Sequence, residues 1–222
     1  MARIARLVVP NIPHHVTQRG NRRQRTFFCR EDYLAYIALV AELKHQAGVD
    51  IWAYCLMPNH VHLIVVPEHP DALADLFREA HKRYTRKVNF REGWRGHLWQ
   101  ERFHSSAMDD AHLHAAVRYV ELNPVRANLC SRPQEWPWSS VHAHLTEKDD
   151  QLVAVAPMLH RVDNWAEYLG QQDSPELYES IRNHEKSGRP LGSDLFIENL
   201  EQLTGRDLCR RNPGPRSRPR GS

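Results

Sequence analysis

The sequence predicts an α+β fold with a small C-terminal extension. Three observations support this prediction. Residues 51–66 have the composition of a strand, a tight turn and a second strand. Segments with helical spacing of apolar residues lie on both sides of that hairpin, and the character of the chain changes after residue 145. At 222 residues with 41% hydrophobic content, the chain is long and apolar enough for one ordinary core, with or without a tail.

The first predicted strand spans residues 13–20 and ends at a glycine, and a polar basic loop follows at 21–25. So many positive charges in a short segment repel each other unless water or phosphate groups surround them. A solvated loop is the alternative, but we favour phosphate contact. The clustered residues are Arg19, Arg22, Arg23 and Arg25.

Two helices are predicted on either side of the hairpin. The first, at residues 31–48, opens with acidic residues and closes at a glycine, and the second spans 71–88. Three basic residues of the second helix recur at one-turn spacing, namely Arg78, Lys82 and Arg86. A charged helix face is usually just solvated, but this spacing also suits a nucleic-acid backbone.

The predicted hairpin places two histidines on one strand face. Residues 51–56 are apolar and β-branched, Pro58–Asn59 forms the turn, and residues 60–66 are extended again. Because strand side chains alternate, His60 and His62 share a face, and the apolar residues between them point to the core. Two neighbouring imidazoles suit a divalent metal, although two histidines without a ligand explain the pattern equally well.

A third helix is predicted at residues 109–123, capped by Asp109 or Asp110 and ended by Pro124. Tyr119 and Asn123 lie four positions apart on the flank of its apolar stripe, which makes them neighbours on a helix. Taken alone, such a tyrosine is usually an edge residue with its hydroxyl in water. Before this helix, the aromatic residues of 94–103 either stack on unpaired bases or seal an edge of the core.

The remaining segments divide into a helical extension at 146–205 and a basic tail at 206–222, after a first domain at 8–145. Short amphipathic helices are expected at 165–169 and 176–181, and a stronger one at 195–203. The Pro/Arg-rich tail is expected to be disordered unless bound.

Charge and composition limit the classes of function. Residues 1–30 contain seven arginines and no acidic residue, and residues 206–222 have a net charge of +5. Since the whole chain is +3, residues 31–205 are left with −9, so the ends are suited to bind a polyanion. Four widely separated cysteines favour reduced thiols in a cytoplasm. The sequence predicts neither a signal peptide nor a membrane helix.

Several separate motifs resemble the REP-associated tyrosine transposases, a branch of the HUH (His-hydrophobic-His) single-strand nucleases. Residues 57–65, Met-Pro-Asn-His-Val-His-Leu-Ile-Val, and 118–127, Arg-Tyr-Val-Glu-Leu-Asn-Pro-Val-Arg-Ala, match two of these motifs. The resemblance covers roughly residues 8–145. Further matches in the same order lie at residues 15–21, 83–85, 98–103 and 137–140.

This resemblance implies an antiparallel sheet flanked by helices, of ferredoxin-like or RRM-like plan. It also implies cleavage and rejoining of single-stranded DNA beside hairpins of repetitive extragenic sequences. Tyr119 matches the nucleophile, and His60 and His62 match the metal ligands. Asn123 stands where relatives place a third metal-binding amide, and shorter relatives often have glutamine there. Arginines expected to contact DNA are Arg19, Arg22, Arg23, Arg83, Arg102 and Arg126.

The resemblance further implies Mg²⁺ or Mn²⁺ as cofactor and a monomer rather than a dimer. Judged by ligand softness alone, two imidazoles and one amide would suit zinc or manganese. Phosphate oxygens and water would complete the coordination shell, however, and these are ligands of a hard cation. A covalent phosphotyrosine would conserve the phosphodiester bond energy for rejoining.

Two other functions stay open. A non-cleaving protein of the same fold that binds structured nucleic acid would need no nucleophile. A metallohydrolase that activates water with the two histidines would not depend on Tyr119.

Overall fold

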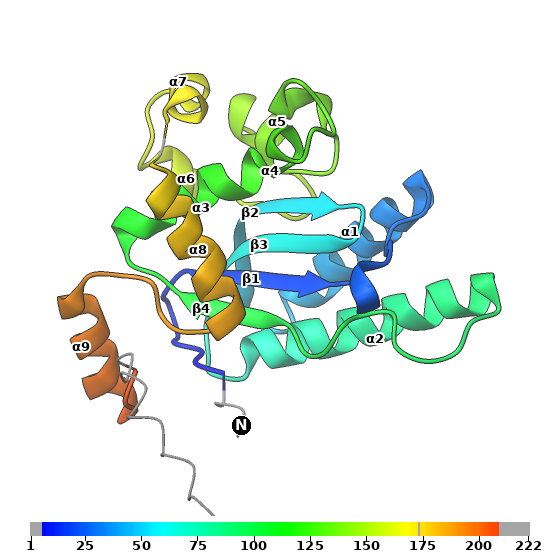
Figure 1. The fold of residues 1–222 in the computed structure, drawn as a ribbon, viewed down its shortest axis with the longest axis horizontal. Helices are drawn as coiled ribbons and strands as arrows, with labels where there is room; N and C mark the ends of the chain where they lie inside the picture. Colours follow the sequence, from blue (N-terminus) through cyan, green and yellow to red (C-terminus); the bar gives the residue numbers. More distant parts are fainter. Residues whose placement is uncertain (1–5, 173, 209–222) are drawn as a thin grey trace, which may run out of the picture.

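The computed structural model describes residues 6–172 and 174–208, and its centre is a four-stranded antiparallel sheet (Figure 1). The strand order is β2-β3-β1-β4. With one helix between β1 and β2 and another between β3 and β4, the chain follows the β-α-β-β-α-β order of a ferredoxin-like domain. The predicted α+β fold is confirmed. The strands are β1 (His14–Arg19), β2 (Val49–Met57), β3 (His60–Pro67) and β4 (His104–Ala107).

One face of the sheet is covered by α1 (Arg30–Lys44) and α2 (Ala72–Glu92). Val61, Leu63 and Val65 point to this side and are fully buried in the main core, as their alternation predicts. The second helix extends four residues beyond its predicted end. It closes at Gly93, whose φ of 66° lies in the left-handed region that glycine adopts without strain.

The opposite face of the sheet is covered by α3 (Asp110–Glu121) and α8 (Pro175–Ser187), and Figure 1 shows α8 crossing the sheet beside α3. The side chain of Asp109 accepts a hydrogen bond from the backbone N–H of His112, which is the predicted N-cap. The helix ends near its predicted boundary. The chain then continues into a single turn, α4 (Asn123–Arg126), whose first two residues include a proline.

The extension packs on the domain rather than standing apart from it. Glu121, at the end of α3, is fully buried and accepts hydrogen bonds from Ser140, His144 and Trp165. The three predicted helices of the extension are confirmed. The remaining helical elements are η1 (Asn21–Arg23), η2 (Pro133–Glu135), α5 (Val141–Leu145), α6 (Ala156–Leu159), α7 (Trp165–Gly170) and α9 (Asp194–Thr204).

Two predictions can be compared with the structure only over the residues that it describes. Of the predicted basic tail, only residues 206–208 lie within the described residues. In the described ranges, none of the helices combines the length and the apolar composition that a bilayer crossing requires.

Candidate active site

The candidate site lies on the sheet face that α3 and α8 cover. In the pairing of β1 with β3, Thr17 is opposite His62 and Arg19 is opposite His60. Because paired residues point to the same side and each strand alternates, His15 joins these residues on one face. His60 and His62 lie with ring centroids 4.8 Å apart, so the predicted histidine pair forms.

Each histidine of the pair has one ring nitrogen occupied by a neighbour. His60 Nδ1 lies 2.6 Å from Asn59 Oδ1, and His62 Nδ1 lies 3.0 Å from His15 Nε2. His62 Nε2 is buried without a hydrogen-bond partner among the described residues. The Asn59 oxygen can only accept, so His60 carries its proton on Nδ1 and keeps the Nε2 lone pair free, the arrangement found in metal-binding histidines. The contact with His15 holds the His62 ring in place, and which of these two rings donates depends on their tautomers. The donor set therefore fits a divalent ion on the Nε2 side of the pair.

The histidine rings are neutral in this environment. Burial lowers the pKa of His15 to about 3 and, together with the positive charge of Arg19, lowers the pKa of His60 to about 3. Burial first, and then the neighbouring His60 and His15, lower the pKa of His62 well below its usual value. Since metals bind the unprotonated imidazole, the site is already in the binding form at neutral pH.

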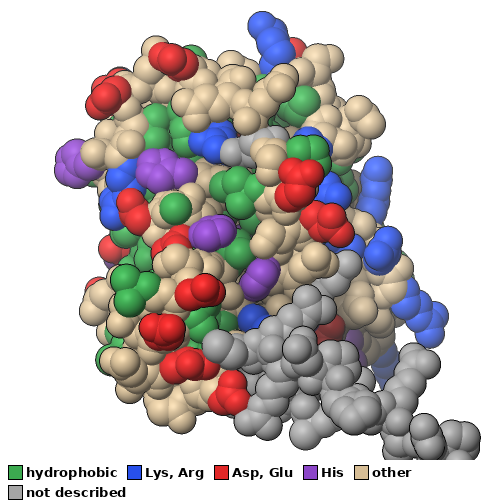
Figure 2. All heavy atoms as spheres, turned by 60° about the vertical axis from the view of Figure 1, so that its left-hand side comes forward, with side chains coloured by type: hydrophobic (Ala, Val, Ile, Leu, Met, Phe, Trp, Pro, Cys, Tyr) green, Lys and Arg blue, Asp and Glu red, His purple; other side chains and the backbone are tan. Residues whose placement is uncertain are grey.

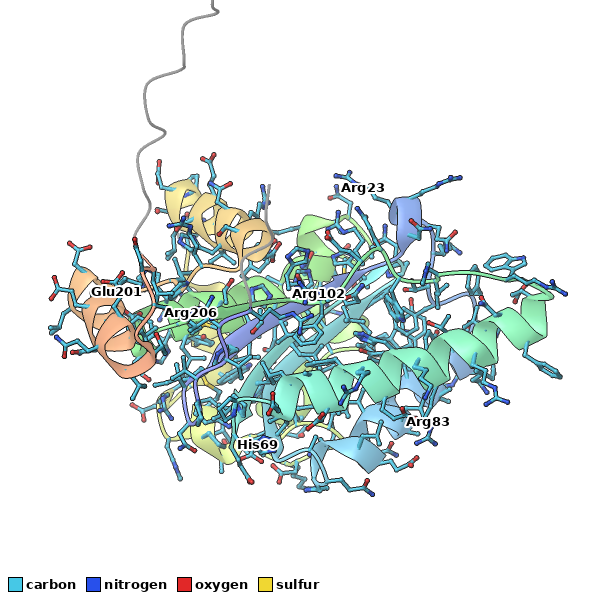
Figure 3. All side chains as sticks on the ribbon, turned by 90° about the horizontal axis from the view of Figure 1, so that it is seen from below. Arg23, His69, Arg83, Arg102, Glu201 and Arg206 are labelled. Carbon is cyan, nitrogen blue, oxygen red and sulfur yellow. The ribbon has the colours of Figure 1, made fainter. Side chains whose placement is uncertain are left out.

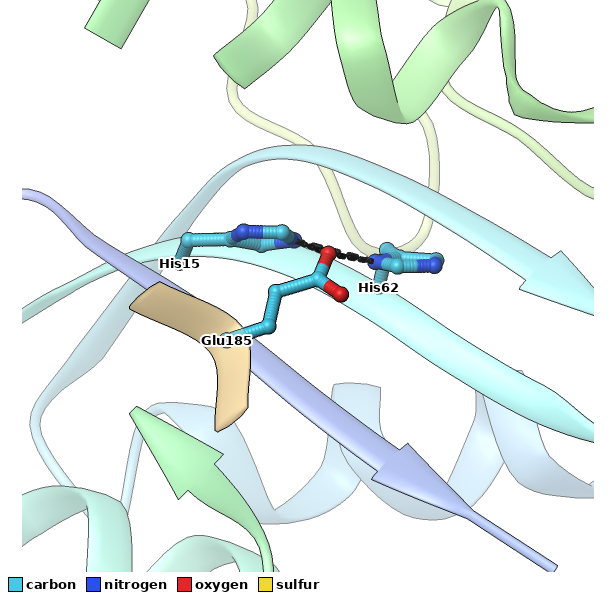
Figure 4. A group of neighbouring side chains, drawn as sticks. All are labelled: His15, His62 and Glu185. Atoms are coloured by element: carbon cyan, nitrogen blue, oxygen red, sulfur yellow. Dashed lines mark hydrogen bonds and ion pairs between the residues drawn. The ribbon is translucent and has the colours of Figure 1, made fainter. Parts of the chain in front are cut away.

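A carboxylate from the extension enters the same site. Glu185 on α8 places Oε1 3.5 Å from His62 Nδ1 and 3.7 Å from His15 Nε2, as Figure 4 shows. One ligand atom from each of the three residues lies within 4.8 Å of the others, close enough for a single ion. Burial raises the pKa of Glu185 to about 7. A second candidate ion position therefore exists, on the Nδ1 side of His62.

Tyr119 lies next to this group on α3. Its ring centroid is 5.7 Å from that of His62 and 6.0 Å from that of His15. Burial, and after it the negative charge of Glu185, raise the pKa of the Tyr119 phenol. Tyr178 of α8 packs beside the ring at 5.8 Å, and Tyr119 is only 6% exposed. The predicted nucleophile and the histidine pair are thus brought together.

Asn123 is linked less directly to the His60–His62 pair than Tyr119 is. Because α3 ends at Glu121, Asn123 begins the separate turn α4 instead of extending the helix of Tyr119. Within residues 6–172 and 174–208, no hydrogen bond joins the Asn123 side chain to Tyr119, His60 or His62. Its role as third ligand stays a prediction.

The predicted DNA-contacting arginines fall into three groups. Arg19, Arg23 and Arg102 line a cleft of about 290 Å³ together with the histidine pair and Glu185. Arg22 is exposed on η1 in left-handed geometry, with φ of 52°. Figure 2 shows basic side chains gathered along one edge of the face it presents, apart from most of the acidic ones.

The other two arginines already have partners. Arg83 makes a two-pronged ion pair with Glu42, at 2.6 and 3.1 Å, and Figure 3 shows it on the side of α2 away from Arg102. Arg126 lies beside Tyr119, with its guanidinium carbon 4.0 Å from the Tyr119 ring centroid. It also donates a 2.6 Å hydrogen bond to the Tyr119 carbonyl. This geometry suits Arg126 to a role at the reacting centre.

Two residues of the site were not assigned a role from the sequence. His15 lies within a motif that was matched as a whole, and its partner on β3 becomes visible only through strand register. Glu185 lies in a polar segment of the extension, far from every motif. Its burial in the site depends on where α8 packs, which no local pattern encodes.

Comparison with known proteins agrees with this architecture. A family model described as "Transposase IS200 like" matches residues 8–123. A solved REP-associated tyrosine transposase bound to a REP hairpin is similar, with 23% identity and a TM-score of 0.57 over 69% of this chain and 92% of that one. A protein of Deinococcus radiodurans R1 described as a candidate transposase matches with 20% identity and a TM-score of 0.39, over 54% and 96%. A search of curated proteins gave no match.

Proposed function

The chain belongs to the family of IS200-like transposases, and from this membership we propose that it cuts and rejoins single-stranded DNA beside hairpins of repetitive extragenic sequences. The reaction would use a divalent metal ion and a covalent bond between Tyr119 and a DNA phosphate. The observation that carries the proposal is the position of Tyr119 beside the His60–His62 pair on one face of the sheet, with ring contacts from Tyr119 to His62 and from His62 to His60.

The histidine pair supplies the proposed metal site. Both rings are oriented by contacts at Nδ1, since His60 Nδ1 donates to Asn59 Oδ1 and His62 Nδ1 is paired with His15 Nε2. His62 Nε2 is buried without a partner among the described residues. When bound there, Mg²⁺ or Mn²⁺ would act as a Lewis acid on the scissile phosphate. Asn123 remains the proposed third ligand, and Glu185 is the nearest carboxylate if the ion lies on the other side of His62.

Tyr119 is the proposed nucleophile. Its oxygen would attack phosphorus as the bond to the leaving oxygen breaks, which transfers the phosphodiester to the tyrosine and frees one DNA end. The Glu185 carboxylate, whose charge acts on the phenol, is the group that we propose takes the phenolic proton. The Arg126 guanidinium lies over the ring and would stabilise the negative charge on the phenolic oxygen. A strand transfer in the opposite direction would return the phosphodiester to a new DNA end.

Arg19, Arg23 and Arg102 would hold the DNA backbone in the cleft beside the histidines. Arg22 on the neighbouring turn would extend this basic surface. Arg83 could contact DNA only if it exchanged its ion pair with Glu42 for a phosphate. Both side chains of this pair are about half exposed, and such a pair stabilises the fold by about 1 kcal/mol or less.

The proposal is tested with labelled hairpin oligonucleotides taken from the DNA flanking the gene, with Mn²⁺, with Mg²⁺ and with a chelator. Wild-type protein is expected to cut only with metal and to retain DNA covalently through denaturation, with the nucleotide on Tyr119. Tyr119→Phe should bind the hairpins but neither cut nor form the adduct. Tyr178→Phe is the matched control, since it removes a hydroxyl from the neighbouring ring.

Two outcomes would contradict the proposal. Cutting by Tyr119→Phe at a near wild-type rate would favour a hydrolase that activates water at the histidines. Hairpin binding without any cutting or adduct, under all metal conditions, would favour the non-cleaving binding protein.

A further inference from the structure

A long groove runs along α2, separate from the face that carries the histidine pair. It has a volume of about 870 Å³. One wall is formed by residues of α2 that recur every three to four positions from Ala74 to Phe90, so they form one continuous helix face. At a rise of about 1.5 Å per residue, this face is roughly 24 Å long. The other wall comes from residues 94–103, and we call this feature the α2 groove.

The α2 groove is lined with aromatic rings along its length. Phe77, Trp99 and Phe103 form its floor and are buried in the main core. At its open end, Phe90 is 91% exposed and Trp94 is 43% exposed. Trp94 keeps this exposure although its ring contacts Phe28 edge-on, with centroids 5.6 Å apart. Exposed aromatic faces are the surfaces on which unpaired bases stack.

The rim of the α2 groove is basic. Arg78, Lys82 and Arg86 line it at one-turn spacing, and Arg102 faces them from the other wall, as its position above α2 in Figure 3 shows. Two of these cations have exposed partners within the helix, since Arg78 pairs with Asp75 and Lys82 pairs with Glu79. Exposed pairs of this kind contribute little and are readily exchanged for a phosphate.

Two buried polar atoms of residues that line the α2 groove have no hydrogen-bond partner among the described residues. Gln18 Nε2 donates to the backbone carbonyls of Arg19 and Glu101, so the amide orientation is fixed, because only the NH₂ group can bond to a carbonyl. Gln18 Oε1 is therefore the unpaired atom, and Trp99 Nε1 is also buried and unpaired. Both atoms lie beneath the surface of the groove, so recognition of a strand rests on the exposed rings and the basic rim.

The α2 groove opens toward the active site. Gln18, Glu101 and Arg102 line both the α2 groove and the cleft that contains His60 and His62. A strand lying in the groove would therefore lead to the reacting centre. An acidic peptide would satisfy the basic rim, but it would leave the exposed rings and the continuity with a DNA-cutting cleft unexplained.

We propose that the α2 groove binds the unpaired strand next to a DNA hairpin, with bases stacked on its aromatic residues and phosphates on its basic rim. This inference rests on the proposed function, because it names the part of the DNA substrate that the groove holds. The groove would thereby position the strand that enters the active site.

The test measures binding with a chelator present, so that no cutting occurs. The probes are hairpins from the DNA flanking the gene, either blunt or with an unpaired extension at the 5′ or the 3′ end. An extension should tighten binding to wild-type protein by about 10-fold or more, in the range expected for stacking of a few bases. The fluorescence of a 2-aminopurine in the extension should be quenched on binding, and Phe90→Ala should reduce this quenching.

A matched pair of variants distinguishes binding in the groove from a general effect of positive charge on DNA affinity. Arg86→Glu reverses a charge in the groove, whereas Lys87→Glu makes the same change one position along the helix, on an exposed residue outside it. Arg86→Glu should remove most of the gain from the extension, Lys87→Glu should retain it, and both should bind blunt hairpins equally well. Equal losses in the two variants would overturn the inference.

The inference and the proposed function fail in different ways. If extensions add no affinity while wild-type protein binds and cuts hairpins normally, the groove does not hold the strand and the proposed function stands. If wild-type protein binds none of the hairpins and forms no covalent adduct with metal present, the proposed function falls, and the inference with it.

Discussion

The two faces of the central sheet use the same strands for different purposes. On β3, Leu63 points into an apolar core under α1 and α2, whereas His62 points to the other side, among polar groups brought by β1, α3 and α8. Alternation makes this division possible within consecutive residues. The apolar face is completed mainly by hydrophobic contact. On the other face, buried polar groups such as His62 and Glu121 are paired with residues from distant segments.

The largest expected effect is on the histidine face. Removing the imidazole in His60→Ala should lower the rate of metal-dependent cleavage on the order of 10³-fold, because Lewis-acid catalysis contributes several kcal/mol. The free energy of unfolding should change little, since His60 is only partly buried. Cleavage kinetics and urea titration measure the two quantities. Wild-type cleavage by this variant would mean that the histidine face holds no catalytic ion.

The opposite result, a loss of stability with cleavage retained, is expected for a residue on the apolar face of the sheet. Leu63→Ala leaves a cavity in a fully buried position and should reduce the free energy of unfolding by about 2–5 kcal/mol. Cleavage per folded molecule should be retained at a temperature where the variant is still folded. Denaturant unfolding and single-turnover cleavage test this. A variant that is stable but inactive would show that the two faces are not separable.

A smaller effect is expected from the residues that orient the histidines. Asn59→Ala removes the partner of His60 Nδ1 and should weaken Mn²⁺ affinity by about 10–100-fold, as loss of such outer partners generally does. Calorimetric titration with Mn²⁺ measures it. His15→Ala is the informative companion. If its loss of affinity is far larger than that of His60→Ala, the ion lies on the Nδ1 side of His62, with Glu185.

The smallest effect concerns a buried histidine near the apolar face. His81 Nε2 is hydrogen-bonded to Tyr36 at 2.9 Å, and burial lowers the pKa of His81 to about 3. Below pH 6.5 the unfolded chain binds the proton more readily than the folded one, so the stability from neutral His81 falls as the pH drops from about 6.5 toward 3. The contribution is at most about 1.4 kcal/mol per pH unit.

His81→Gln, which retains a polar group for Tyr36, tests this expectation. The free energy of unfolding of the variant should depend less steeply on pH between 6.5 and 4.5 than that of the wild type. Denaturant titrations at several pH values measure the slopes. Parallel slopes for the two proteins would show that His81 is not held in its neutral form by folding.

The sequence predicted those features that depend on the periodicity of apolar residues and on the residues that begin or end helices and strands. The alternation on β3 gave both faces correctly, and the helix ends near Gly93 and Glu121 were placed within a few residues. The strand β4 was not identified, because its four residues, His-Ser-Ser-Ala, include no β-branched or aromatic side chain. It is a strand only because β1 offers it a free edge, which is a tertiary effect.

The candidate site was predictable only in part for the same reason. Tyr119 and the histidine pair belong to motifs, and the structure brings them together. Asn123 was expected to be a helical neighbour of Tyr119, but the helix ends between them. Glu185 became visible only when α8 was seen to pack on the sheet, because a polar residue in an amphipathic helix carries no sign of its burial.

The position of β1 also bears on how the protein is made. Of the four strands, β1 leaves the ribosome before the others and lies in the interior of the sheet, where His14 pairs with Val65 on one side and Ala107 on the other. Its two neighbours are synthesised much later, so the sheet closes through contacts between distant parts of the sequence, which form slowly. Tyr119 on α3 and Glu185 on α8 follow β4 in the chain. A prematurely terminated product that stops before β4 would therefore contain the paired histidines but not the tyrosine and carboxylate of the candidate site.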